Sequence, residues 1–177
     1  LYDYAKMKKF TKGISLLFFA AVLMLVIATA RLTDFSRIFS AGSPWFRQVF
    51  FGISLLFYAG MVYALFFALP FSKTYGACSG ENDVVNTGVY ALCRHPGVPF
   101  LILGYIFLWL AAGGTELLIA TVTFSLCDIV HVTIQDRFFF PHTLEGYEQY
   151  QKITPFLFPT KKSIRAFFQG LKTTQKD

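Results

Sequence analysis

Charged residues are scarce in this sequence. Aspartate, glutamate, lysine and arginine together make up 15% of its 177 residues, whereas a typical soluble domain carries about 25%. Hydrophobic residues make up 55%, and the mean hydropathy is +0.52. This shortage of charge argues against a water-soluble domain and indicates that the main solvent and partner of the chain is a lipid bilayer. The length is that of a single domain.

Cysteine and acidic residues are also few. The three cysteines, Cys78, Cys93 and Cys127, form no CxxC pair, so the sequence predicts neither a disulfide framework nor a cysteine metal site. The 10 acidic residues are outnumbered by 16 basic ones, which gives a net charge of +6. The basic residues flank apolar runs, as they do in membrane proteins. We therefore expect no nucleic-acid partner.

Four long apolar runs are present instead. A helix needs roughly 20 apolar residues to cross a hydrocarbon core of about 30 Å. Gly113 and Gly114 make a tight reversal between the last two runs, which predicts a helical hairpin. We expect an all-α, polytopic membrane bundle forming one domain over residues 1–177, with four spans at about 13–30, 49–69, 98–112 and 117–134.

The basic residues are distributed unevenly around these runs. Of the 16 lysines and arginines, 13 lie before residue 13, within 71–97 or after Ile134, and only three lie on the other side. The positive-inside rule then places both termini in the cytoplasm. The loop 71–97 and the segment 135–177 would form a cytosolic cap. Within that segment, 161–172 alternates basic and apolar residues, which is typical of a helix lying on an anionic membrane surface.

The fourth apolar run carries polar residues on one side. Asp128, His131 and Gln135 are spaced i, i+3 and i+7, so they share a helix face. Ionisable groups at membrane depth usually serve a function. Asp128 could orient His131 as a general base, and the alternative is a structural polar pair. Adding His95 and His142 supplies metal-ligand types, but their spacing matches no established site, so we expect no metal.

The interval from Asn82 to Phe100 is polar and rich in turns. It contains Gly88-Val-Tyr90, three further residues and then Arg94-His95-Pro96. This pattern resembles the signature of the isoprenylcysteine carboxyl methyltransferase-like membrane methyltransferases. That family continues with a helical hairpin, an acidic cluster, a Tyr-x-x-Tyr and two spaced prolines. The corresponding residues here are Gln135-Asp136, Tyr147 and Tyr150, and Pro155 and Pro159.

The resemblance covers Asn82 to about Pro159 and implies that S-adenosylmethionine binds at the cytosolic end of the bundle. It also implies methyl transfer to a lipophilic or small acceptor at the cytosolic membrane face. Arg94, His131 and Asp128 are the expected catalytic residues. Carried over by position, the cofactor-binding residues are Asn82, Asp83, Val84, Val85, Gly88, Tyr90, His95, Pro96, Gly97, Val98, Gln135 and Asp136.

Some positions depart from the family pattern. Gln135 stands where the family has its cofactor-binding glutamate, and His131 stands where it has an arginine that binds a substrate carboxylate. Asn82 replaces a histidine, and Gly97-Val98-Pro99 replaces a sequence containing tyrosine. The acceptor could therefore be a thiol, an amine, a hydroxyl or a phospholipid headgroup. Two other functions remain open: an NADPH-dependent membrane reductase, and a non-catalytic relative that binds a ligand or partner.

Overall fold

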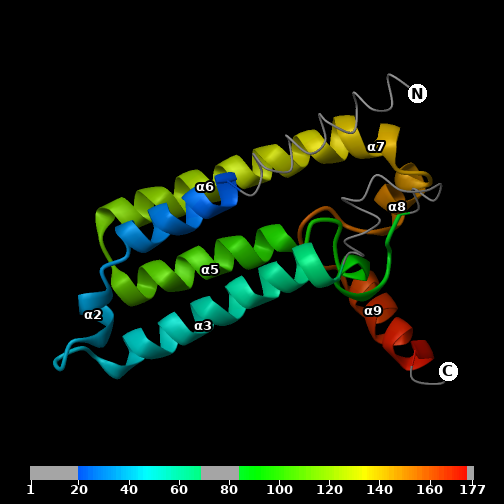
Figure 1. Ribbon diagram of the computed structural model, residues 1–177. Coiled ribbons are helices and arrows are strands. Elements are labelled where there is room, and N and C mark those ends of the chain that lie inside the picture. The colour runs from blue at the N-terminus through cyan, green and yellow to red at the C-terminus, as the bar shows by residue number, and fades with distance from the viewer. Residues whose placement is uncertain (1–19, 69–83, 175–177) are drawn as a thin grey trace.

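The computed structural model describes residues 20–68 and 84–174 (Figure 1). Every regular element in this part of the chain is helical, which confirms the all-α prediction. The helices are an initial one over Ala20–Leu32, α2 (Phe35–Phe39), α3 (Trp45–Val62), α5 (Gly97–Ala112), α6 (Thr115–Ile134), α7 (Phe140–Thr143), α8 (Tyr147–Ile153) and α9 (Lys161–Thr174). Two π-helical turns, η1 (Tyr63–Phe67) and η3 (Gln135–Phe139), and a 3₁₀ turn, η2 (Gly88–Ala91), complete the set.

The long helices run lengthwise beside one another. In Figure 1, α5 lies between α3 and a second layer formed by α6 and the helix Ala20–Leu32. The short α2 and the turn at Gly113 and Gly114 lie at one end of this bundle, and η2, α8 and α9 gather at the other. We call this second end the cap end. Both glycines of the turn have positive φ, 71° and 92°, which explains the predicted reversal between α5 and α6.

Small residues allow α3 and α5 to pack closely. A Cβ atom on Gly104 would lie 2.9 Å from the Tyr58 ring, and one on Gly60 would lie 3.2 Å from the Phe100 ring. Ser54 adds a hydrogen bond from its hydroxyl to the Gly104 carbonyl at 2.8 Å. Small residues at a contact let two helix backbones approach closely, and the helices then associate through van der Waals packing and hydrogen bonds.

Two helical stretches are long and apolar enough to cross a membrane. They are Trp45–Phe67, of 23 residues, and Thr115–His142, of 28 residues. Ala20–Leu32 and Gly97–Ala112 are apolar but shorter. The outer faces keep large apolar side chains uncovered, for example Leu56 at 72% exposure.

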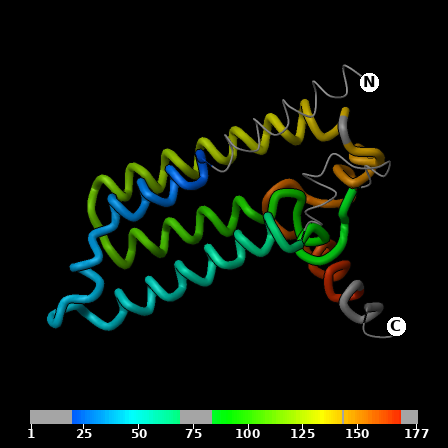
Figure 2. The backbone as a smooth tube through the Cα atoms, viewed as in Figure 1, coloured from blue at the N-terminus to red at the C-terminus, as the bar shows by residue number. Residues whose placement is uncertain are grey.

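Several boundaries differ from those expected. The helix of the second run begins at Trp45 rather than residue 49. Pro44 is the extended residue directly before it, and no proline interrupts the residues that follow. The fourth does not end at Ile134: the backbone continues through η3 into α7, as the tube in Figure 2 shows. The first helix reaches Leu32, and its expected start at residues 13–19 lies outside the described residues, as does the segment 69–83.

Candidate functional site

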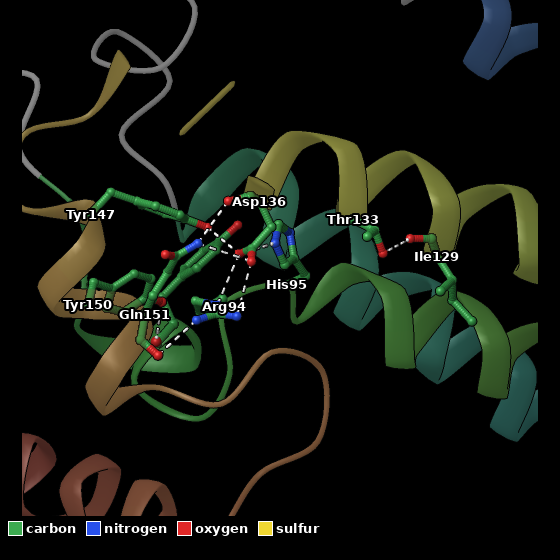
Figure 3. Close-up of polar contacts among 9 residues, drawn as sticks. Arg94, His95, Ile129, Thr133, Asp136, Tyr147, Tyr150 and Gln151 are labelled. Carbon is green, nitrogen blue, oxygen red and sulfur yellow. Dashed lines mark hydrogen bonds and ion pairs between the residues drawn. The ribbon is translucent and has the colours of Figure 1, made fainter. Parts of the chain in front are cut away.

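Polar side chains converge on Asp136 at the cap end of the bundle (Figure 3). Asp136 is only 6% exposed. Arg94 donates from Nη2 to Oδ2 at 3.1 Å, and its Nε lies 3.0 Å from Oδ1. Nε2 of His95 lies 3.2 Å from the same Oδ1. A buried carboxylate is costly unless it is paired and hydrogen-bonded, and Asp136 meets both conditions.

Side chains of α8 complete the shell around this carboxylate. The Tyr147 hydroxyl donates to Oδ1 at 2.6 Å, and the Gln151 amide donates to Oδ2 at 3.2 Å. The Gln151 amide also donates to the backbone carbonyl of Asp136 at 2.8 Å. The backbone carbonyl of Gln151 accepts from Nη1 of Arg94 at 2.9 Å. We call Arg94, His95, Asp136, Tyr147 and Gln151 the Asp136 cluster. It ties the turn before α5, η3 and α8 into one unit.

Asp136 rather than Gln135 faces the motif, at the start of a π-helical turn. The N–H of Phe140 donates to the Gln135 carbonyl, five residues back, so the helix is locally widened. Such turns often occur at functional sites. Gln135, the expected counterpart of the family's glutamate, is half-buried, whereas the neighbouring Asp136 is buried.

A second π-helical turn supports Tyr90. The N–H of Ala68 donates to the Tyr63 carbonyl at 2.9 Å instead of to that of Ala64. The Ala64 carbonyl can therefore accept the Tyr90 hydroxyl, at 3.0 Å. Tyr150 in turn donates from its hydroxyl to the Tyr90 carbonyl at 2.7 Å. Both tyrosines are buried, so they fix η2 between η1 and α8.

Gly88 shapes the backbone at the start of η2. Its φ is +57°, in the left-handed region that other residues enter at a cost. A Cβ atom there would meet nothing within 4 Å, so the requirement is conformational rather than steric. The glycine of the motif therefore shapes the turn that carries Tyr90.

His95 is enclosed by aromatic rings. Its imidazole stacks on Phe140 at 5.9 Å between centroids and meets the edge of Phe156 at 5.2 Å. Burial lowers the pKa of His95 below its ordinary value, and the hydrogen bond to Asp136 only partly opposes this. The backbone N–H groups of Arg94 and His95 donate to the carbonyls of Pro155 and Phe156. These amides are therefore already paired within the chain.

A hollow of about 800 Å³ lies beside the cluster. Its wall includes Val84 and Ala91 from the segment before α5, Tyr150 from α8 and Ala166 from α9. Charged side chains also line it: Glu145, Lys152 and Lys162. The volume falls in the range of about 300–1,000 Å³ that is usual for small-molecule sites. Tyr150 connects the hollow to the cluster, because its ring packs against that of Tyr147 at 5.8 Å between centroids.

The structure brings some of the predicted site residues together and leaves others apart. Three of them belong to the Asp136 cluster: Arg94, His95 and Asp136. Tyr90 is buried and hydrogen-bonded to Ala64. Val84 lines the hollow, and Val85 is half-buried. Pro96 and Val98 are buried, and Gly97 lies against Leu65, so these three pack the start of α5. Asn82 and Asp83 lie outside the described residues.

Asp128 and His131 lie further along α6. Asp128 is half-buried and His131 is exposed, and neither belongs to the Asp136 cluster. Burial lowers the pKa of His95 most, and the charges of Arg94 and His131 add smaller contributions in the same direction.

Two residues of the cluster had no predicted role. Tyr147 belongs to the Tyr-x-x-Tyr that carries the resemblance, and Gln151 belongs to no motif. Burial and the hydrogen bond to Asp136 raise the pKa of Tyr147, so its hydroxyl keeps its proton and donates. The spacing of Tyr147 and Gln151, i and i+4 on one helix, is the signal that could have identified them as a pair.

The described residues hold no cluster of metal-ligating side chains, and one of their two free thiols is buried. Within 20–68 and 84–174, no three His, Cys, Asp or Glu side chains converge where a metal ion could bind. Burial raises the pKa of Cys93 to about 11, which disfavours its thiolate. Compared with protein-family models, curated proteins and solved structures, the chain gives no significant match.

Proposed function

We propose that this chain is a four-span membrane protein that transfers a methyl group from S-adenosylmethionine to a lipophilic or small acceptor. The reaction would take place at the cytosolic membrane face, with both termini on that side. One observation supports the proposal most directly. Motif residues more than 40 positions apart, Arg94 and Asp136, meet in a buried cluster next to a hollow of cofactor size.

The proposed membrane placement is supported by the exposed apolar faces. In Trp45–Phe67 only 11% of the most apolar window is buried, and in Thr115–His142 only 22%. A core helix of a soluble protein would be mostly covered, because leaving apolar surface in water costs roughly 25 cal/mol per Å². Lipid around these faces would remove that cost.

The hollow offers groups that fit the parts of S-adenosylmethionine. The Val84 and Tyr150 side chains give an apolar and aromatic wall suited to adenine, and Glu145 gives a carboxylate suited to the cofactor's cationic groups. Lys152 and Lys162 can bind its carboxylate by charge-assisted hydrogen bonds. When bound, the cofactor supplies an activated methyl group on a sulfonium centre.

The chain's own residues would then align the reactants and exclude water. Arg94 and Asp136 act as positioning residues, because they hold α8 and the turn before α5 that carry the wall of the hollow. His131 would accept the proton of a thiol, amine or hydroxyl acceptor. Asp128 would stabilise the resulting imidazolium from one turn away.

Cofactor binding can be tested without disturbing the buried cluster. We would measure S-adenosylmethionine binding by calorimetry on the full chain in lipid nanodiscs. Ala166→Trp should fill the hollow and weaken binding at least tenfold, because Ala166 lines it and is exposed. The matched control Ala41→Trp, at an exposed position in the turn before α3, should bind like the wild type.

Other outcomes separate the alternative functions. If the folded wild type binds no S-adenosylmethionine at millimolar concentration, the methyltransferase proposal fails. NADPH is titrated in the same experiment, and NADPH binding alone would favour a membrane reductase. Binding of neither would favour a non-catalytic relative. Equal loss of cofactor binding in both tryptophan variants would place the cofactor outside the hollow.

Transfer itself is followed with a methyl-labelled cofactor and a lipid extract as the source of acceptors. His131→Gln should reduce the rate of transfer to a thiol, amine or hydroxyl while leaving cofactor binding unchanged. The control is Val130→Ala, an exposed neighbour on the same helix at 57% exposure. Unchanged transfer in His131→Gln would exclude a role for this histidine as the base.

A further inference from the structure

Helix α9 has one face against the protein and one face turned away. Ser163 is 4% exposed, and Ala166 lines the hollow, so this side packs towards η2 and α8. Ile164 and Phe168, spaced i and i+4 on another side, are 40% and 56% exposed. The two apolar side chains therefore form an uncovered stripe, as far as the described residues are concerned.

Basic residues border this stripe. Lys161 and Arg165 are exposed and are also spaced i and i+4, so they form a parallel row next to Ile164 and Phe168. The sequence of α9 contains no aspartate or glutamate. An apolar row beside a purely cationic row is the pattern of helices that lie in the plane of an anionic membrane surface.

The start of α9 is fixed firmly enough to hold this face in place. Thr160 and Ser163 cap the helix reciprocally: the Thr160 N–H donates to Oγ of Ser163 at 2.8 Å, and the Ser163 N–H donates to Oγ1 of Thr160 at 3.3 Å. Just before the cap, Phe158 is 71% exposed. The apolar exposure at this end thus begins before the helix and continues along it.

The position of α9 in the molecule suggests what covers the face. Figure 1 shows α9 leaving the cap end of the bundle and pointing away from α3 and α5 rather than packing along them. This is the end at which the long apolar helices finish, where a bilayer surface would lie.

We propose that the face formed by Lys161, Ile164, Arg165 and Phe168 binds anionic lipid headgroups of the membrane in which the bundle resides. Ile164 and Phe168 enter the boundary between headgroups and acyl chains, and Lys161 and Arg165 contact lipid phosphates. The inference rests on the membrane placement proposed above, and it does not depend on methyl transfer.

The test uses nitroxide labels on the full chain in nanodiscs of phosphatidylcholine with or without phosphatidylglycerol. In a background without Cys78, Cys93 and Cys127, one label replaces Phe168 and a matched control replaces Gln169, about 100° further round the helix. Collisions with oxygen report lipid, and collisions with a water-soluble nickel complex report water. With phosphatidylglycerol, we expect the label at 168 to collide mainly with oxygen and the label at 169 to collide more with nickel.

Replacing Lys161 and Arg165 by glutamine should remove the dependence on phosphatidylglycerol. If the label at 168 collides mainly with nickel in both lipids, the face lies in water and the proposal fails. If that label is shielded from both reagents, protein covers the face, and the proposal also fails. Cofactor binding is measured on the same nanodiscs, so its absence does not affect the collision result. A chain that does not enter nanodiscs would overturn the membrane placement itself.

Discussion

At the scale of single residues, Asp136 carries the largest share of the cap's polar contacts. Its carboxylate receives Arg94, His95, Tyr147 and Gln151 within 3.2 Å. Removing one partner from a buried charge pair is strongly destabilising, because the other charge is left without compensation. Loss of the Asp136 carboxylate would therefore weaken the contacts of η3 with α8 and with the turn before α5.

Asp136→Asn should lower the free energy of unfolding by about 3 kcal/mol, since it leaves the Arg94 guanidinium buried without an opposite charge. Thermal unfolding in one detergent measures the effect. The control is Asp34→Asn, which breaks the exposed pair of Asp34 with Arg37 at 3.0 Å and should change stability little. Equal losses in the two variants would contradict the assigned importance of the cluster.

His95 should make the stability of the cap depend on pH. Burial holds its folded pKa below 6.5, so the unfolded chain binds the proton more readily than the folded one. The stability contributed by neutral His95 is therefore complete above pH 6.5 and is lost as the pH falls towards the folded pKa. The melting temperature of the wild type should drop on acidification below pH 6.5.

The comparison variant is His95→Gln, which keeps a hydrogen-bonding amide and does not titrate. The difference in melting temperature between wild type and variant should shrink as the pH falls through this window. A difference that stays constant from neutral to acidic pH would show that His95 does not titrate differently in the folded and unfolded states.

At the scale of elements, the contact of α3 with α5 depends on the absence of side-chain volume. Gly104→Ala would place a Cβ 2.9 Å from the Tyr58 ring and should cost about 1–3 kcal/mol through overpacking. Gly52→Ala, also within a helix but with nothing within 4 Å, should be neutral or slightly stabilising. Denaturation of both variants under the same conditions measures the contrast, and a loss at Gly52 as large as at Gly104 would refute it.

The two π-helical turns, η1 and η3, both lie next to the site. One leaves the Ala64 carbonyl free to accept from Tyr90, and the other contains Asp136, which contacts Arg94 and His95. Both occur where a long apolar helix reaches the cap end. The polar contacts of the cluster therefore help to stabilise a backbone geometry that an isolated helix would not favour.

At the scale of the whole molecule, the uneven distribution of basic residues predicts that the cap end faces the cytoplasm. We expect a cysteine at Lys161 and a cysteine at Ala41 to lie on opposite sides, because positive charge is retained in the cytoplasm. In sealed vesicles of known orientation, an impermeant maleimide should label Lys161→Cys only from the cytoplasmic side and Ala41→Cys only from the other. Labelling of both from one side would refute the proposed topology.

The sequence by itself determined the helical class and the position of most helices. Runs without charge at 49–69 and 98–112 indicate apolar helices, because a helix pairs its backbone groups within one segment. Gly113 and Gly114 determined the reversal in the same way, through local backbone freedom. The motif also pointed to Arg94, His95 and Asp136 as residues of one site.

Only the tertiary structure decided how those residues meet. Asp136 rather than Gln135 faces Arg94 because the side of the helix that packs against the bundle is the one that buries Val132, four residues before Asp136. Gln151 joins the cluster because α8 lies against η3, where the Gln151 amide donates to the backbone carbonyl of Asp136 (Figure 3). Periodicity reports the faces of single helices, whereas the partner of each buried charge is set by how those helices pack together.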